Sequence, residues 1–417
     1  MAISYDELHA AVTGGAVGVR ARTVLEPLGG RGDKVFPPTY GPPQGEKVEA
    51  MASRYALEQR RDPEGGSVVE SVVLDSVASQ ANRFELALLG AVRRQELALP
   101  ITCVDFSSWP ELGLDRISDL EAPHRVFDAL LRDSYDGELL FRLAGAGRAI
   151  TDATPRNAAA VFCYAPATLL FGGWDSTGPK GGRGAKYERA ITSEIIATGI
   201  ITGSKTSSRL DPAAIEKVGT VYASASDVGW TLDPNEAATD GKGKPAQKGA
   251  PSDINHGNIA PTIDTKAGGV TAARIEATTV ISFVQLRRIQ FPTGTDPQAL
   301  LAERGVAEAS ARTALAALGL AAATLAFEEG FDLRSRCVLT ATGPLSFELV
   351  GRAGEITDFR LTSVEALALV TDAASAAASA GLPWRTDELT LRPSDRLVDL
   401  IRRSREHAMA SGDGGDA

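Results

Sequence analysis

The sequence has few of the residues that build metal or redox sites. Among its 417 residues are three cysteines, which lie far apart and form no C-x-x-C pair: Cys103, Cys163 and Cys337. This pattern argues against a zinc site or a disulfide framework and favours buried, reduced thiols. The four histidines also form no local pair: His9, His124, His256 and His407. We therefore expect no cofactor, no metal and no histidine-based catalysis.

Long apolar runs and an excess of positive charge are also missing. No window reaches the roughly 18 uninterrupted apolar residues of a membrane span. The first residues, MAISYDELHA, are acidic and mixed, unlike a signal peptide. We therefore expect a cytoplasmic protein that makes no membrane contact. The net charge of −10 argues against nucleic-acid binding by the chain as a whole. Salt screens electrostatic interactions beyond about 8 Å, however. Binding therefore depends on whether positive side chains cluster locally.

What remains is typical of a folded soluble protein, with 43% hydrophobic and 23% charged residues. That composition allows one large domain or two to three smaller ones. In the first half, periodicity and capping boxes predict a strand at 18–28, helices at 67–91 and 119–134, and strands at 138–143 and 158–171. The two helices are expected to begin at the capping boxes Ser67–Glu70 and Ser118–Glu121.

The second half continues the irregular alternation of strands and helices. A helix is expected directly after the glycine-rich segment, at about 187–199, and another from Asp296 with Pro297 at its first position. Strands are expected at 218–224, 274–291, 334–340, 346–350 and 355–361, and helices at 363–380 and 394–408. The pattern predicts an α+β fold, an antiparallel sheet backed by helices.

Two segments rich in glycine and proline interrupt this pattern. Residues 29–45 contain GGRGDKVFPPTYGPPQG, and residues 227–269 are polar and lack a large apolar run. Prolines and glycines at this density exclude helix and disfavour a central strand, and the second segment cannot build a core of its own. Both are therefore predicted to project from the fold.

The glycine-rich stretch GGWDSTGPKGGRGAK, residues 172–186, raises the question of phosphate binding. A nucleotide P-loop needs G-x-x-x-x-G-K-[ST], but Gly178 is followed by Pro179, and Lys180 by Gly181. Proline removes a backbone N–H donor, and no hydroxyl stands where magnesium would need it. A G-x-G-x-x-G dinucleotide motif is also missing. A nucleotide-dependent enzyme is therefore disfavoured.

Cations gather around this stretch in an otherwise acidic chain. Lys180, Arg183, Lys186 and Arg189 lie within ten residues, opposed by Glu188. Further along, Lys205 and Arg209 flank three hydroxyl residues. Cations, hydroxyls and exposed N–H groups are what a nucleic-acid backbone requires, and a following helix would add its dipole. From composition alone, a solvated basic loop and an RNA or DNA contact both remain open.

Five stretches carry a resemblance to a known family. They are ESVVLDSVASQANRFE, LEAPHRVFDALLRDS, LLFGGWDSTGPKGGRGAKYERAITSEI, TSSRLDP and INHGNIAP, in this order. Together they resemble the backbone subunit of type I-G (formerly I-U) CRISPR interference (Cascade) complexes, the Cas-seven group of the repeat-associated mysterious protein (RAMP) superfamily. The resemblance covers about residues 20–292 and is looser beyond.

The resemblance implies a modified RNA-recognition-motif (ferredoxin-like) palm with finger and thumb insertions. We place the palm at 18–225 and 270–360 with insertions at 29–66 and 90–157, the thumb at 226–269, and C-terminal helices and a tail at 361–417. Lys242, Lys244 and Lys248 lie near the middle of the thumb segment. Trp174 and Asp175 are expected to lock the glycine loop rather than to touch ligand.

The resemblance also implies a function in antiviral defence. Such subunits polymerise along a guide RNA (crRNA) and display it for pairing with target DNA, so the expected partners are the guide RNA, target DNA in the RNA–DNA hybrid, and copies of the chain itself. The large subunit, a Cas-five/Cas-six-type subunit and a recruited helicase-nuclease complete the set. The expected RNA-binding residues, combining the cation cluster with family-like positions, are Arg20, Lys34, Gln80, Asn82, Arg83, Lys180, Arg183, Lys186, Arg189, Lys205, Ser207, Ser208 and Arg209. For Gln80, Asn82 and Arg83, structural hydrogen bonds are an equal alternative.

A catalytic alternative involves Asp33. Related subunits that target RNA use an acidic residue in a loop after the first strand, and Asp33 lies in such a loop, in GRGDK. A turn or a salt bridge is the commoner role for an aspartate in that setting. We therefore expect a non-catalytic RNA scaffold, with an Asp33-dependent metal ribonuclease as the alternative.

Overall fold

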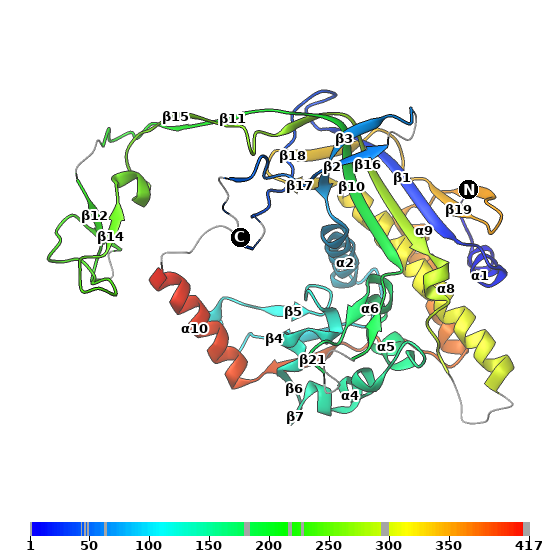
Figure 1. The fold of residues 1–417 in the computed structure, drawn as a ribbon. Coiled ribbons are helices and arrows are strands. Elements are labelled where there is room, and N and C mark those ends of the chain that lie inside the picture. The colour runs from blue at the N-terminus through cyan, green and yellow to red at the C-terminus, as the bar shows by residue number, and fades with distance from the viewer. Residues whose placement is uncertain are drawn as a thin grey trace. The chain divides into compact units, whose positions relative to one another are not determined.

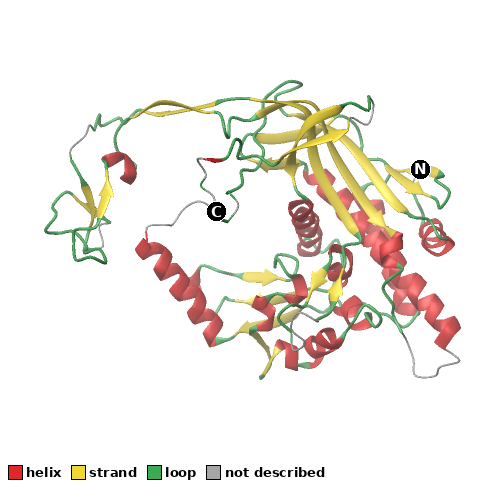
Figure 2. Ribbon diagram, viewed as in Figure 1, coloured by secondary structure: helices red, strands yellow, loops and turns green. Residues whose placement is uncertain are grey.

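A computed structural model describes residues 2–42, 44–45, 47, 50–61, 65–178, 184–215, 219–226, 229–292 and 300–411. The chain divides into two compact units. Unit 1 comprises Met1–Arg31, Val73–Ala197 and Arg274–Ala417, and unit 2 comprises Gly32–Val72 and Thr198–Ala273. Figures 1 and 2 show the elements of each.

The main sheet has the strand order of a ferredoxin-like fold. Its path is β17 (Phe331–Arg334), β18 (Cys337–Ala341), β1 (Gly18–Pro27), β16 (Val270–Ser282), β10 (Ile191–Thr202), β3 (Val68–Asp75) and β2 (Leu57–Arg61). β1 pairs antiparallel with β16, from Gly18 opposite Ser282 to Leu25 opposite Ile275, and also with β18.

Two helices complete this arrangement. Along the chain, α2 (Val77–Arg93) lies between β1 and β10, and α8 (Leu300–Glu329) between β16 and β18. Taking β1, β10, β16 and β18 as the first to fourth strands gives the spatial order 4-1-3-2 of a β-α-β-β-α-β unit. The predicted α+β fold with an antiparallel sheet, consistent with a modified RNA-recognition motif, is confirmed.

Helix α8 forms the centre of the core of unit 1. Alanine and leucine occupy all its faces between Ala307 and Leu325, and most of these side chains are buried. It packs against α1 (Tyr5–Gly14), α2 and α9 (Ser363–Ser379). Its segment Gly305–Glu329 is long and apolar enough to cross a membrane, but 83% of that window is buried, as in the core helix of a soluble protein.

A second sheet in unit 1 joins distant parts of the chain. Its order is β5 (Arg116–Ser118), β4 (Thr102–Asp105), β21 (Leu389–Pro393), β6 (Ser134–Asp136) and β7 (Leu139–Leu140). β21 pairs parallel with β4 and antiparallel with β6, and α10 (Asp395–Ser411) follows it. The sequence did not predict β21, whose pairing joins it to segments far away in the chain.

Four sequence predictions between residues 67 and 199 name the wrong kind of element over part or all of their range. Residues 68–75 form β3 rather than a helix, because the valine-rich run pairs with β2 and buries Val72 and Leu74. Helix α2 begins later, where the N-cap Ser76 accepts a hydrogen bond from the N–H of Ser79. The apparent strand at 158–171 is two short buried helices, α5 (Ala159–Tyr164) and α6 (Pro166–Phe171).

The other two concern 119–134 and 187–199. Ser118 does bond Glu121, but only η3 (Arg125–Phe127) and α3 (Ala129–Arg132) follow, because Arg125 takes a φ of 54° that breaks a helix. The expected helix after the glycine segment is β9 (Lys186–Tyr187) and β10, since β-branched residues there pack into the main sheet.

Other predictions are confirmed in full or in part. The strand at 18–28 is β1, and that at 218–224 contains β12 (Val221–Ala223). The strand predicted at 274–291 is confirmed up to Ser282, as β16, but Phe283–Leu286 form the short helix α7. The strand predicted at 138–143 is confirmed only at Leu139–Leu140, as β7, because Phe141–Leu143 form the 3-10 helix η4. The later elements are β17, β18, β19 (Phe347–Val350), β20 (Ile356–Phe359), α9 and α10. Asp296 and Pro297 lie outside the described residues.

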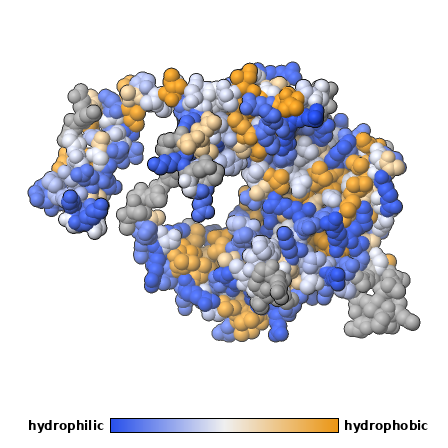
Figure 3. Space-filling model, viewed as in Figure 1, coloured by the Kyte–Doolittle hydropathy of each residue, from blue (hydrophilic) through white to orange (hydrophobic). Residues whose placement is uncertain are grey.

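Unit 2 contains the second glycine- and proline-rich segment. β11 (Lys205–Arg209) pairs antiparallel with β15 (Ile259–Asp264), and this ribbon leads to a small sheet of β12, β13 (Trp230–Thr231) and β14 (Gln247–Gly249). We call residues 219–258 the distal lobe. Its surface in Figure 3 is mostly hydrophilic, and Val221, Thr231 and Pro251 are its buried side chains among the described residues.

Candidate nucleic-acid interface

The glycine-rich segment is a β-hairpin rather than a phosphate-binding strand–loop–helix. β8 (Gly173–Trp174) pairs antiparallel with β9, and the N–H of Asp175 donates to the carbonyl of Ala185 at 2.9 Å. Because β9 and β10 stand where the helix was expected, the dipole contribution expected from that helix is wrong. Lys180 and Arg183 lie outside the described residues.

The base of this glycine hairpin is held by a buried ion pair. The Asp175 carboxylate is 2% exposed and lies 2.6 Å from Nη1 of Arg142. This agrees with the locking role expected for Asp175. Trp174 instead keeps 47% of its surface exposed, with Lys186 Nζ 5.9 Å from its ring centre. Lys186 is thus presented to solvent beside an aromatic face.

A second buried pair supports the start of the hairpin. Arg125 donates from Nε and Nη2 to the two carboxylate oxygens of Glu85, at 2.5 and 2.7 Å, and from Nη1 to the carbonyl of Gly172 at 3.0 Å. Both side chains are almost fully buried. Gly172 has a φ of 87°, and an added Cβ would lie 2.8 Å from Cγ of Arg189. Helix α2 is thereby connected to the hairpin through one guanidinium group.

Burial controls the ionisation of this region. It raises the pKa of Glu85, opposed by hydrogen bonds and charge from Arg125. It lowers the pKa of Arg189, with Arg125 adding to the effect and Glu85 opposing it. Burial also raises the pKa of Asp119 to about 7, against the hydrogen bond from the Thr102 N–H, and the charge of Glu85 adds to the rise. The predicted RNA-binding residue Arg189 is therefore half-buried beside a second arginine.

Of the three RNA-binding residues predicted on α2, two make hydrogen bonds within the protein and one is exposed. Gln80 is buried, donates to Asp75 Oδ2 at 2.6 Å and accepts from Ser193 Oγ at 2.9 Å. Arg83 donates to the Asp75 carboxylate and to the carbonyls of Asp332 and Leu333. Asn82 is exposed. The structural alternative accounts for the contacts of Gln80 and Arg83.

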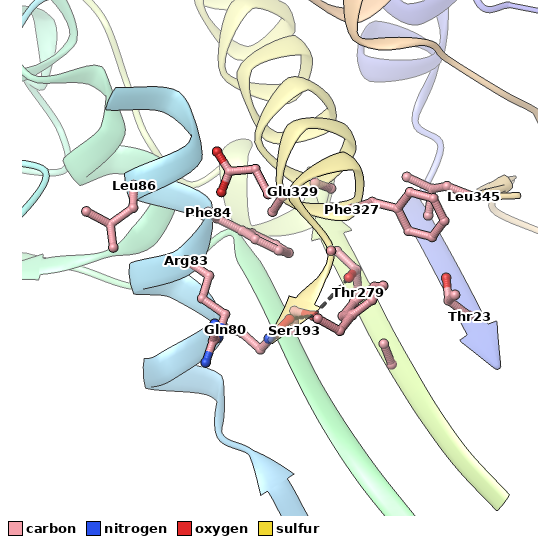
Figure 4. A pocket seen from close by; sticks show the side chains of 15 residues that line it. Thr23, Gln80, Arg83, Phe84, Leu86, Ser193, Thr279, Phe327, Glu329 and Leu345 are labelled. Atoms are coloured by element: carbon pink, nitrogen blue, oxygen red, sulfur yellow. Dashed lines mark hydrogen bonds between the residues drawn. The ribbon is translucent and has the colours of Figure 1, made fainter. Parts of the chain in front are cut away.

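Gln80 and Arg83 also line a cavity of about 140 Å³ in unit 1. Figure 4 shows it between the strands that carry Thr23, Ser193 and Thr279 and the helices that carry Phe84 and Phe327. Ser193 and Thr279 share a hydrogen bond of 2.9 Å across its floor. Its size suits a few water molecules rather than a nucleotide.

Arg20 and Lys34 also have partners. Arg20, on β1, forms an ion pair with Glu348 on the adjacent β19. Lys34 Nζ donates to the carbonyl of Ser204 at 2.8 Å and lies 5.5 Å from the Phe36 ring centre. Both cations are used within their own unit, so each can contact phosphate only in addition to these partners.

Of the RNA-binding residues predicted on β11, three are exposed, and Arg209, the last residue of the strand, makes hydrogen bonds to the backbone. Lys205, Ser207 and Ser208 are exposed, and Ser207 Oγ bonds Thr262 Oγ1 on β15 at 2.8 Å. Arg209 instead donates Nε to the carbonyl of Gly257 at 3.0 Å and Nη2 to that of His256 at 2.9 Å. Lysine and hydroxyl groups of the ribbon therefore remain accessible, whereas Arg209 shapes the backbone.

Sequence reasoning missed Glu85, Arg125 and Arg142. Arg125 lies inside the family-like stretch LEAPHRVFDALLRDS, yet its partner is 40 residues away on α2. Such pairing leaves no periodic signal. Asp33 accepts a hydrogen bond from the N–H of Lys34 at 2.8 Å, as a turn residue does. Within the described residues, no group of three or more histidine, cysteine, aspartate or glutamate side chains could hold a metal ion.

A model of a known protein family matches part of the chain. Residues 19–202 match the model of the family described as CRISPR-associated protein GSU0053. No curated protein matches the chain. The matched segment includes β1, α2, the glycine hairpin and β10, and it supports a CRISPR-associated protein.

Proposed function

We propose that this chain is the guide-RNA-binding backbone subunit of a type I-G interference complex, a cytoplasmic protein of the Cas-seven group. It polymerises along the RNA and presents the bases for pairing with target DNA. The observation that carries this proposal is the 4-1-3-2 strand order of an RNA-recognition motif in a chain that matches a CRISPR-associated family over residues 19–202.

The exposed cations suit sequence-neutral contact with phosphate. Lys186 beside Trp174, and Lys205 and Ser208 on β11, are exposed and offer positive charge and a hydroxyl group. Lys180 and Arg183 extend the same hairpin in sequence. The ion pairs of Asp175 and Glu85 hold the base of the hairpin, next to Lys186, in place.

We assign the palm, the insertions, the thumb and the C-terminal helices to the residue ranges predicted from the sequence, with the thumb at 226–269. The large subunit, a Cas-five/Cas-six-type subunit and a helicase-nuclease are its proposed partners. In this proposal the subunit cuts neither guide nor target. The turn-forming hydrogen bond of Asp33 supports that view.

The test is expression of the chain together with a guide-RNA array. We expect short RNA of uniform length to remain bound through purification, and Asp33→Ala to retain the same RNA uncut and unchanged. Recovery of an RNA-free chain would contradict the proposal. Magnesium-dependent cleavage that disappears in Asp33→Ala would replace it with the ribonuclease alternative.

Replacing Lys180, Arg183 and Lys186 together with alanine should weaken RNA binding equally for all sequences. The slope of log K against log[salt] should fall by about 0.7 for each lost contact to a single strand. Fluorescence anisotropy over a salt series measures both quantities. The matched control replaces Arg148, Arg396 and Arg403, which are 71%, 70% and 75% exposed. Equal slopes for the two triple variants would remove the hairpin from the RNA site.

A further inference from the structure

Two of the sequence motifs come together in unit 2, outside the residues matched by the family model. TSSRLDP ends β11, and INHGNIAP leads from η6 (Pro251–Ile254) into β15. The register places Arg209 opposite Ile259. The second motif therefore turns back directly over the first, at the junction of the ribbon and the distal lobe.

Arg209 and Asp211 fix the backbone of this junction. The guanidinium of Arg209 donates to the carbonyls of His256 and Gly257, and the Asp211 carboxylate accepts from the N–H groups of Gly257 and Ala213. The N–H of Asp211 donates to Asn258 Oδ1 at 2.7 Å. The side chains of Arg209 and Asp211 thus make hydrogen bonds to backbone groups and are not available to contact bases. These bonds hold the loop at 255–258 in one conformation.

The junction also holds backbone in the left-handed region. Ala214, with a φ of 50°, and Asn255, with a φ of 62°, adopt it at a cost, whereas Gly257, with a φ of 80°, adopts it freely. An added Cβ at Gly257 would lie 3.1 Å from the carbonyl oxygen of Ile215. Strained residues persist only where the surroundings enforce them, and they concentrate at binding sites. An open cavity of about 410 Å³ adjoins this loop, with Ser252, His256 and Asn258 among its lining residues.

An exposed aromatic pair stands beside the cavity. The rings of Trp230, on β13, and His256 have centroids 6.0 Å apart at 68°. Trp230 keeps 39% of its surface exposed, and His256 is exposed. The distal lobe has few apolar residues with which to build a core. Because burial of apolar surface is favourable, a tryptophan that served only for packing would be expected inside that small core. An exposed tryptophan against a rigid, strained loop is instead the arrangement of a stacking surface.

We propose that Trp230 and His256 form a stacking subsite for one unpaired base of single-stranded RNA. This inference rests on the proposed function and adds the contact made by the distal lobe. Stacking on aromatic faces tolerates every base, because each base presents a π surface. The side chains of Ser252 and Asn258 at the cavity add polar groups without selecting one base.

The test measures binding of fluorescein-labelled oligo(U) and oligo(A) to the full chain. Trp230→Ala should lower affinity about tenfold for both, whereas Trp230→Phe keeps a stacking ring and should stay within about twofold of wild type. Leu232→Ala is the matched control, because Leu232 is an exposed apolar residue two positions along, and it should bind as wild type. Because no phosphate contact is lost, the salt slope of Trp230→Ala should be unchanged.

Crosslinking of 4-thiouridine RNA gives an independent readout. We expect adducts on peptides that contain Trp230 or His256. Unchanged affinity for Trp230→Ala, or crosslinks that avoid both peptides, would overturn the subsite while leaving RNA binding by the rest of the chain intact. A wild-type chain that binds neither oligonucleotide would overturn the subsite and the proposed function together.

Discussion

Arg125→Met should destabilise the protein by about 3–5 kcal/mol, because it leaves the carboxylate of Glu85 buried without its partner. Arg125 provides both hydrogen bonds to that carboxylate and the bond to Gly172 at the base of the glycine hairpin. RNA binding should fall with it, since the hairpin loses its support. Chemical denaturation monitored by circular dichroism gives the free energy of unfolding.

Two comparisons separate the buried pair from general effects. Arg93→Met removes an exposed pair with Glu121 and should cost less than about 1 kcal/mol. The double variant Glu85→Leu/Arg125→Met leaves no unpaired charge and should regain most of the lost stability. A double variant as unstable as Arg125→Met would show that the cost comes from the bond to Gly172 or from packing, not from the buried carboxylate.

The contribution of Asp119 to stability should fall as the pH rises from about 4 to about 7. This residue is buried at the end of β5, where its carboxylate accepts from the N–H of Thr102 and its own N–H donates to the Thr102 carbonyl. Its pKa rises from 3.8 in the unfolded reference to about 7. The folded protein therefore holds the proton more tightly, and the stabilisation is complete below pH 4 and is lost as the pH rises through 7.

Asp119→Asn tests this directly. The amide keeps an oxygen for the Thr102 N–H but does not ionise, so the variant should gain about 2–4 kcal/mol on the wild type between pH 4 and pH 8. Burial also raises the pKa of Glu85, which is present in both proteins. It therefore adds the same contribution to the pH dependence of stability in the wild type and in the variant. Unfolding measured across this range in both proteins would contradict the account if the two curves ran parallel.

The sequence predicted secondary structure correctly where the local residue pattern fitted only a strand or only a helix. The alternation in GVRARTVLEP predicted β1, and the C-terminal periodicity predicted α9, whose capping box Thr362–Glu365 forms. SVVESVVLD fits both the helical period and the strand period, and the choice was made by the partner strand β2. The buried run 158–171 shows no polar face, so the periodicity of its apolar residues could not distinguish a helix from a strand.

For the candidate site, the sequence located the cations but not their partners. Lys186 and Lys205 are exposed, as a phosphate contact requires. Gln80, Arg83 and Arg209 instead make hydrogen bonds that hold the fold, through groups such as Asp75 and the carbonyl of Gly257. Those partners lie on other elements, and side-chain pairing between elements depends on tertiary packing that residue type alone does not encode.

The mass of the chain assembled on guide RNAs of increasing length tests the central claim most directly. If the protein is a backbone subunit, the particle mass should rise in steps of one 43.6 kDa chain for each fixed increment of nucleotides. Mass photometry resolves such steps. A particle that stays at one chain on every RNA, or a chain that remains free of RNA at all lengths, would contradict the account.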